Sequence, residues 1–445
     1  MAEETISRRL SRYIDEISFA DIPDDVVERA KGRLLDSLSC AFAGYNLPWS
    51  KIAVETGRQS RGKCTVLASE EKVAAMEAAY INGVLAHSIL QEDTGAGGHP
   101  STIITPAVLA VAEQEDSSGI EVLLAIVLGY DISERISLGE ALSIKKGFRG
   151  TFFGSFGAAA AVGKLMGLSQ DQIANAIGHV ANLSSGLLET WWSGTMEAVF
   201  AAGFAAKNGI MAAVLAQAGA TSAEKALEGE DGFYQAFFGR NERLDYATMA
   251  FGKDFGIMKV VEKYYPACAA SQWPIETSLR LMVEYGIDPK NIESVVEYGA
   301  IPIPGFSLSA PYQNMFQAQM SHKFCIAAAL LGKPVDDFMF YFNSHNDPEV
   351  ADLARKISLE VGGEEHRIEL VMLNGYRYSL EADQSHPLIG YYPTIESMQK
   401  KFKRLAGGYL GDEQAEMIIE KVINLDKLGS IRELSTMFDD KKNPV

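Results

Sequence analysis

The segment HSILQEDTGAGGHPS, residues 87–101, holds the side chains best suited to chemistry, because histidines, acids, a threonine and glycines stand close together in it. Asp93, Thr94 and His99 lie in a glycine-rich stretch, where the backbone can approach a ligand closely, so an acid–base site is one interpretation. The other is an ordinary turn, in which Asp93 and Thr94 cap a helix end and Pro100 begins the next helix. The residues of this segment alone leave both interpretations open.

Two other kinds of site do not fit this segment. A Walker-type phosphate loop needs a lysine after its glycines and a strand before them, and the GAGG run has neither. The trio His87, Asp93 and His99 matches no standard spacing of zinc ligands, and no cysteine lies nearby, so we expect no metal. His87 falls on an apolar, alanine-rich helical pattern and is expected to be a core histidine, as is His179.

Two further segments carry charges that could serve a substrate. Lys145, Lys146 and Arg149 precede a predicted helix, and helix N-termini and arginine side chains both favour carboxylates and phosphates. A solvated basic turn is the equal alternative. In VVEKYYPACAASQWP, residues 260–274, Lys263 lies at a predicted domain boundary, where sites often form. A buried lysine there could act as a base, whereas an isolated lysine is usually a surface charge.

The elements that must position these segments are helical through the first part of the chain. Residues 1–265 show helical spacing of apolar residues almost throughout, as with Val26, Ala30 and Leu34. Several of these predicted helices are rich in alanine and glycine, which indicates close approach of their backbones in a helical core.

The pattern changes after about residue 265. Residues 292–301 are short and β-branched, and residues 366–382 alternate on both sides of Asn374-Gly375, the strongest short-range signal for a hairpin. We therefore predict a mainly α fold with a large all-helical domain and a smaller α+β lid domain. The helical domain comprises residues 1–265 completed by residues 401–445, and the lid comprises residues 266–400.

The composition argues against several kinds of partner. The chain of 445 residues carries a net charge of −18, which disfavours nucleic acid and anionic membranes, because both bind basic surfaces. The four cysteines show no CxxC spacing and indicate free thiols in a reducing compartment. The N-terminus has no apolar signal segment, and the apolar run at 198–220 is interrupted by Lys207 and Asn208. A cytoplasmic protein is therefore expected.

Taken in order, four motifs resemble the MmgE/PrpD family: AHSILQEDT…HPS, GFRGTFFGSFGAAAAVGKLMGL, AAGFAAKNGIMAAVLA and K-x-YPAC. The resemblance runs over nearly the whole chain, through HPLIGYYP…KKF near its end. It implies a helical domain with an inserted α+β lid, a homodimer, and an active site between the domains. It also implies a small di- or tricarboxylate substrate, no metal or organic cofactor, and removal of a proton from the carbon next to a carboxylate.

The resemblance carries over to individual residues only in part. It implies that Asp93 and His99 are catalytic with Lys263, the lysine before the YPAC motif, and that Thr94 binds substrate. Several positions depart from the family pattern. Leu90 stands at a position where the family often has an aspartate, Arg149 where it has a histidine, and Glu197 where it has a lysine. Ser271-Gln272 replaces a second histidine, and Phe324 replaces a tyrosine.

These departures bear on the reaction. Epimerisation needs only a base on one face of a carbon and a donor on the other, and Lys263 and His99 could fill these roles. Arg149, with Lys146, Thr94 and Gln272, would bind the substrate carboxylates, and Glu197 would hold a substrate amine or pair with Arg149. The leading hypothesis is thus a cofactor-independent epimerase or isomerase of an amino- or imino-dicarboxylate. The alternatives are a 2-methylcitrate-type dehydratase, a cis-aconitate-type decarboxylase and a non-catalytic carboxylate-binding protein.

Overall fold

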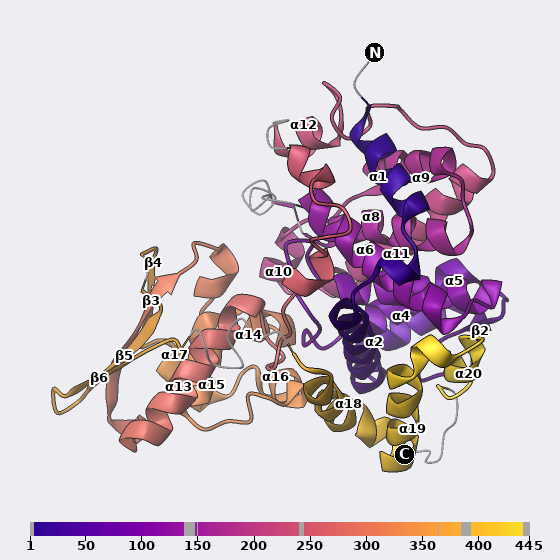
Figure 1. The fold of residues 1–445 in the computed structure, drawn as a ribbon. Coiled ribbons are helices and arrows are strands. Elements are labelled where there is room, and N and C mark those ends of the chain that lie inside the picture. Colours follow the sequence, from indigo (N-terminus) through magenta and orange to yellow (C-terminus); the bar gives the residue numbers. More distant parts are fainter. Residues whose placement is uncertain are drawn as a thin grey trace.

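The computed structural model describes residues 4–137, 147–148, 150–239, 244–363, 365–383 and 393–438. A large helical body and a smaller part with a sheet lie side by side (Figure 1). The helices of the body before the smaller part are α1 (Ile6–Glu16), α2 (Asp24–Gly44), α3 (Pro48–Gly57), α4 (Ala75–Ala86), α5 (Ile104–Glu115), α6 (Gly119–Ser137), α8 (Thr151–Leu165), α9 (Gln170–Leu183), α10 (Glu189–Ser193), α11 (Glu197–Gln217) and α12 (Phe233–Phe238). The predicted mainly α fold with a smaller α+β part is confirmed.

Small residues let the central helices of the body approach one another closely, as the sequence predicted. A Cβ atom at Gly157 of α8 would lie 2.3 Å from the carbonyl oxygen of Gly129 in α6. A Cβ atom at Gly209 of α11 would lie 2.5 Å from the Cβ of Ala158 in α8. Helix α11 is long and apolar enough to span a membrane, but it packs against α4, α8 and α9 as a core helix does.

The smaller part contains a mixed four-stranded sheet. Its strands are β3 (Ile292–Ala300), β4 (Ile357–Val361), β5 (Arg367–Met372) and β6 (Arg377–Glu381), in the order β4-β3-β5-β6. Strands β3 and β4 are parallel, and the other neighbours are antiparallel. The hairpin predicted at Asn374-Gly375 is present, and Gly375 has the positive φ of 84° that this turn requires.

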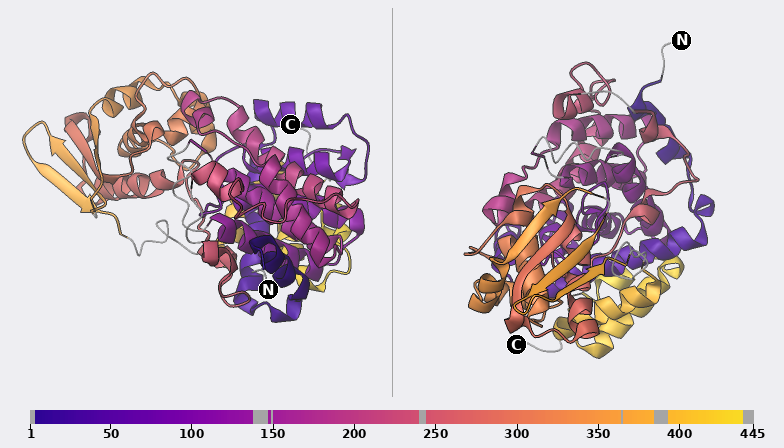
Figure 2. Two further views of the ribbon diagram at one scale, coloured as in Figure 1. Left: turned by 90° about the horizontal axis from the view of Figure 1, so that it is seen from above. Right: turned by 90° about the vertical axis from the view of Figure 1, so that its left-hand side faces the viewer.

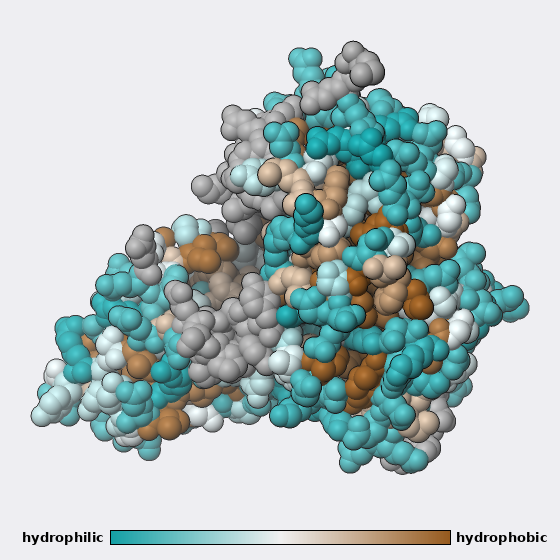
Figure 3. Space-filling view, viewed as in Figure 1, coloured by the Kyte–Doolittle hydropathy of each residue, from teal (hydrophilic) through white to brown (hydrophobic). Residues whose placement is uncertain are grey.

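Helices separate the sheet from the body. They are α13 (Gln272–Tyr285), α14 (Met315–Met320), α15 (His322–Leu330), α16 (Phe338–Ser344) and α17 (Pro348–Ala354). The left view of Figure 2 shows the sheet at the edge of the smaller part far from the body, and in the right view the sheet faces the viewer. Buried residues of the body, including Trp49 and Val84, pack into the same core as this part, so the two parts share an apolar contact. The surface seen in Figure 3 is mainly hydrophilic, with smaller apolar areas between.

The chain returns to the body at its end. The last helices are α18 (Ile395–Leu410), α19 (Asp412–Ile423) and α20 (Arg432–Ser435). Helix α18 packs along α2, and Met398 and Phe402 are buried in the core of the body. A residue near the C-terminus of the chain can therefore reach the loops that follow α4.

Candidate active site

A cavity of about 170 Å³ lies where the body meets the smaller part. Its polar side chains are Thr94, His99, Thr151, Lys263 and Cys268. His99 and Thr94 come from the loop after α4, and Lys263 comes from the segment that leads into the smaller part. The cavity therefore brings together two segments that lie far apart in the sequence and that both contain predicted site residues.

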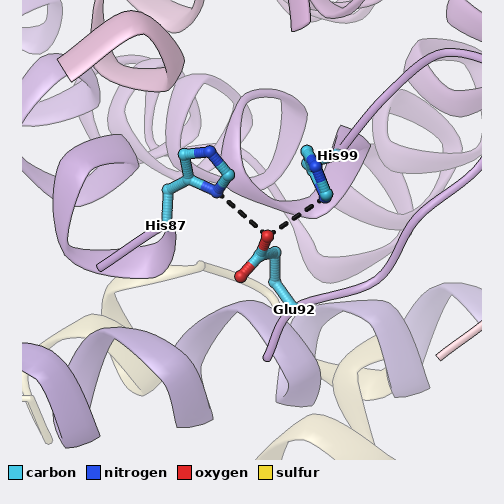
Figure 4. Close-up of side chains that lie close together, drawn as sticks. All are labelled: His87, Glu92 and His99. Atoms are coloured by element: carbon cyan, nitrogen blue, oxygen red, sulfur yellow. Dashed lines mark hydrogen bonds and ion pairs between the residues drawn. The ribbon is translucent and has the colours of Figure 1, made fainter. Parts of the chain in front are cut away.

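Glu92 is the centre of a cluster of ionisable groups beside this cavity (Figure 4). Its Oε1 atom lies 3.0 Å from Nδ1 of His87, 3.0 Å from Nδ1 of His99 and 3.2 Å from Nζ of Lys263. Glu92, His87 and Lys263 are fully buried. Burial alone would raise the pKa of Glu92, but the charge of Lys263 and the two imidazoles hold it well below its usual value. The cluster thus contains a buried carboxylate that stays ionised.

An ionised Glu92 decides the orientation of the histidines. A carboxylate only accepts hydrogen bonds, so the Nδ1 atoms that face it carry their protons. Nδ1 of His99 also lies 3.0 Å from the carbonyl oxygen of Asp93. In the neutral ring, Nε2 of His99 is then the basic nitrogen. His99 lines the cavity and keeps 20% of its side chain exposed, so it combines an oriented ring with access to a ligand.

Asp93 faces the body rather than the cavity. Its Oδ2 atom accepts a hydrogen bond of 2.7 Å from the hydroxyl of Tyr130, and its Oδ1 atom accepts one of 3.0 Å from the backbone of Ser101. Arg33 lies 3.7 Å from the same carboxylate. Burial raises the pKa of Asp93, while Arg33 opposes this shift. The predicted catalytic carboxylate of Asp93 therefore does not line the cavity, and Glu92 is the acid that contacts Lys263 and His99.

Lys401 of α18 holds the two site segments against each other. Its Nζ atom donates to Asp36 over 2.6 Å, to the carbonyl oxygen of Gln91 over 2.6 Å and to that of Lys263 over 3.0 Å. Asp36 in turn accepts a hydrogen bond of 2.8 Å from the backbone of Asp93. This buried network fixes the backbone on both sides of the Glu92 cluster.

Leu90, interpreted from the sequence as a departure from the family pattern, lines the cavity. Its φ of 58° is unusual for a residue with a side chain. The conformation turns its carbonyl oxygen to Nζ of Lys263, 2.5 Å away. Leu90 thus contributes through its backbone, and its side chain adds an apolar surface to the cavity.

The N-terminus of α8 offers a place for a carboxylate. Gly150 and Thr151, where this helix begins, line the cavity, and the hydroxyl of Thr151 is buried without a hydrogen-bond partner among the described residues. The free N–H groups of a helix N-terminus attract anions. Gly98 packs directly on Gly150, since a Cβ atom there would lie 2.7 Å from the carbonyl carbon of Gly150. The glycine-rich loop therefore brings His99 next to this helix end.

The other predicted site residues have different places. Thr94 lines the cavity, and its backbone pairs with Val261. Gln272 is buried outside the cavity lining, where its Oε1 atom accepts the backbone N–H groups of Tyr264 and Tyr265. Glu197 is exposed at the start of α11 and does not line the cavity.

The remaining positions singled out in the sequence are Arg149, Lys146, Phe324 and His87. Arg149 and Lys146 lie outside the described residues. Phe324, at one of the departures from the family pattern, is fully buried and packs against Tyr312 and other aromatic rings of the smaller part. His87 is fully buried, as expected of a core histidine, yet its bond to Glu92 makes it part of the cluster.

Sequence reasoning did not single out Glu92. The two adjacent acids have different surroundings: Glu92 contacts His99 and Lys263, whereas Asp93 is bound by Tyr130 and Ser101. The sequence shows the adjacent acids but not which of them contacts the lysine and the histidine. The missing information is the direction of a short irregular segment, which the surrounding helices decide.

The same cluster has the donor atoms of a possible metal site. His87, Glu92 and His99 each offer one ligand atom, and these three atoms lie within 4.8 Å of one another. Two imidazoles with a carboxylate form a known set of zinc ligands. However, the ammonium group of Lys263 lies 3.2 Å from the same carboxylate oxygen. A divalent ion would have to bind beside this fixed positive charge. These residues therefore fit a proton-transfer cluster better than a metal centre.

Comparisons with known proteins agree with this architecture. The MmgE/PrpD N-terminal domain matches residues 8–244 and the MmgE/PrpD C-terminal domain matches residues 265–427. The chain therefore belongs to the MmgE/PrpD family. It is 26% identical to the cis-aconitate decarboxylase-like protein oryM of Aspergillus oryzae, over 98% of both chains. It is 26% identical to the cis-aconitate decarboxylase of Aspergillus terreus, over 98% of this chain and 96% of the relative. The human cis-aconitate decarboxylase is 24% identical over 100% and 96% of the two chains.

Proposed function

We propose that this protein is a lyase that removes CO2 from a small unsaturated carboxylate. The observation that carries the proposal is the contact of Glu92 with both His99 and Lys263 at the wall of one cavity. This arrangement offers an oriented imidazole and a cation to the same ligand. The similarity to cis-aconitate decarboxylases over nearly the full length of the chain supports the reaction type.

Decarboxylation of a β,γ-unsaturated carboxylate needs one proton transfer. The distal alkene carbon takes a proton, the double bond moves by one position, and the bond to the leaving carboxylate breaks to release CO2. The electron pair of the broken bond becomes the new double bond. In this proposal the imidazolium form of His99 donates the proton from Nε2 to that carbon, while Glu92 accepts the Nδ1–H hydrogen bond, and solvent then returns a proton to Nε2. Lys263 stabilises the negative charge that develops on a remaining carboxylate.

The structure weakens the argument for an epimerase of an amino- or imino-dicarboxylate. That hypothesis depended on Glu197 as a partner for a substrate amine, and Glu197 is exposed outside the cavity lining. The acidic group that lies beside the cavity, Glu92, already contacts His87, His99 and Lys263. A carboxylate without an amine suits these groups better.

The test is turnover of a panel of unsaturated di- and tricarboxylates in D2O. We expect CO2 release together with deuterium at the former alkene carbon. His99→Gln and Lys263→Met should each lower kcat by about 100-fold or more. His179→Gln is the matched control, since His179 lies outside the cavity lining and contacts the carbonyl oxygen of Ala220. Deuterium exchange without CO2 release would favour the epimerase, and full activity of both site variants would refute the assignment of roles.

A further inference from the structure

A large share of the cavity wall is apolar. The side chains concerned are Leu188, Trp191, Trp192, Ile303, Phe306 and Met320. Trp191 belongs to α10 of the body, whereas Ile303 and Phe306 come from the turn around the short 3-10 helix at Pro304–Ser307 in the smaller part. The apolar wall is therefore assembled from both parts of the molecule, as the Glu92 cluster is.

Contacts away from the Glu92 cluster hold this wall in place. The side-chain amide of Gln317 donates a hydrogen bond of 2.9 Å to the carbonyl oxygen of Trp192, and that of Asn314 donates one of 2.7 Å to Gly194. Trp192 also lies directly on Gly305, where a Cβ atom would come within 2.1 Å of the indole ring. Because these bonds join α10 to the smaller part, the wall is a built surface rather than an accidental gap.

Such a wall selects against charge. A carboxylate placed against tryptophan, phenylalanine and isoleucine side chains loses its hydration without gaining a partner, which is costly. An apolar group at the same place gains affinity, by about fourfold for each buried methylene. Cis-aconitate, the compound in the names of the relatives, carries three carboxylates and no apolar arm. All three would then have to be bound by the polar groups of the cavity.

We propose that the substrate of this protein carries a hydrophobic arm, which lies against the wall formed by Trp191, Trp192, Ile303 and Phe306. Its carboxylates are bound at Lys263, His99 and the N-terminus of α8. The substrate class is an alkyl- or aryl-substituted unsaturated mono- or dicarboxylate. This inference depends on the proposed function for the reaction, but its binding prediction can be tested without turnover.

The binding test uses saturated compounds that cannot react. Tricarballylate and the 3-alkylglutarates share one skeleton and differ only in a carboxylate or an alkyl group at carbon 3. By titration calorimetry we expect the Kd to fall by about fourfold per methylene from 3-methyl- to 3-propylglutarate. We also expect 3-propylglutarate to bind more tightly than tricarballylate. A Kd that stays constant along the series, or tighter binding of tricarballylate, overturns the inference.

A pair of variants locates the arm. Ile303→Ala should remove most of the gain along the alkyl series, because Ile303 lines the cavity. Ile301→Ala is the matched control: Ile301 lies two residues away, is 50% exposed and does not line the cavity. An unchanged gain in Ile303→Ala overturns the placement of the arm.

Turnover separates the two proposals. The 3-alkylglutaconates are the unsaturated counterparts of the same series, and the wild-type protein should decarboxylate them with kcat/KM that rises with chain length. If cis-aconitate is decarboxylated with higher kcat/KM than every 3-alkylglutaconate, the hydrophobic arm is refuted while the lyase stands. If the alkyl series binds as expected but releases no CO2, the lyase fails while the arm stands.

Discussion

Replacing Glu92 by glutamine removes one negative charge from the centre of the site without changing the shape of the side chain. Glu92 is fully buried and contacts three groups, His87, His99 and Lys263, at 3.0 to 3.2 Å. In Glu92→Gln the ammonium group of Lys263 is left buried, with the carbonyl oxygen of Leu90 as its remaining hydrogen-bond acceptor among the described residues. We therefore expect the substitution to affect both stability and the orientation of the His99 imidazole, the proposed proton donor.

Both effects should be large. Loss of one partner of a buried ion pair typically costs about 3 to 5 kcal/mol, and we expect the free energy of unfolding to fall by about 3 kcal/mol at pH 7, because glutamine keeps one hydrogen bond. The kcat should fall by about 100-fold or more, as when the orienting partner of a catalytic histidine is lost. The pKa of Glu92 is lowered in the folded state, in which Lys263 and the histidines outweigh the effect of burial. The stability advantage of the wild type is thus complete above about pH 4.3 and is lost as the pH falls below it.

Urea unfolding from pH 3 to pH 8 measures this advantage, and CO2 release at pH 7 measures kcat. Glu113→Gln is the control, because Glu113 is also buried and bound, to Thr65 and Ser435, but lies outside the cavity lining. It should lower stability and leave kcat within about twofold. A Glu92→Gln variant with kcat within threefold of wild type and unchanged stability at pH 7 would show that the cluster does not depend on this charge.

Three further predictions concern groups that support the site. Burial lowers the pKa of Lys401, but the charges of Asp36 and Glu262 outweigh burial, so the net pKa is raised. The contribution of Lys401 to stability is therefore present below about pH 10.4 and is lost as the pH rises beyond that value. In urea unfolding, Lys401→Met should lower the free energy of unfolding by about 3 to 5 kcal/mol at every pH from 6 to 9. Burial raises the pKa of Glu134 to about 7, so the folded state retains a proton that the unfolded chain releases near pH 4.3. The free energy of unfolding of the wild type should therefore fall by about 3 kcal/mol between pH 4 and 7, and that of Glu134→Gln should lack this decrease. Equal slopes of stability against pH in the two proteins would contradict this. Gly98 has a φ of 85° and contacts Gly150, so Gly98→Ala should lower kcat/KM at least tenfold, whereas Gly167→Ala, at a φ of 63° with open space around it, should lower stability only.

The sequence predicted the fold from local signals that the tertiary structure did not override. The helical spacing around Val26 and Leu34 corresponds to α2, and the alternation around Asn374-Gly375 corresponds to the hairpin of β5 and β6. The alanines and glycines of α8 were correctly interpreted as positions of close packing. Such patterns are reliable because the periodicity of apolar residues and the backbone demands of a turn are properties of the segment itself. The homodimer, the cytoplasmic location and the division into residues 1–265 with 401–445 and residues 266–400 stay predictions.

The chemistry of the site was only partly contained in the sequence. Residue types alone identified the loop with His99 and the segment with Lys263 as candidates, because both combine reactive side chains with a place between predicted elements. The sequence could not show that Glu92 rather than Asp93 contacts His99 and Lys263, nor that Lys401, more than 130 residues from Lys263, binds its carbonyl oxygen. The direction of a side chain in an irregular loop is set by long-range packing and by buried hydrogen bonds. The tertiary structure therefore decided which acid joins the lysine and the histidine, whereas the sequence determined that these groups were available.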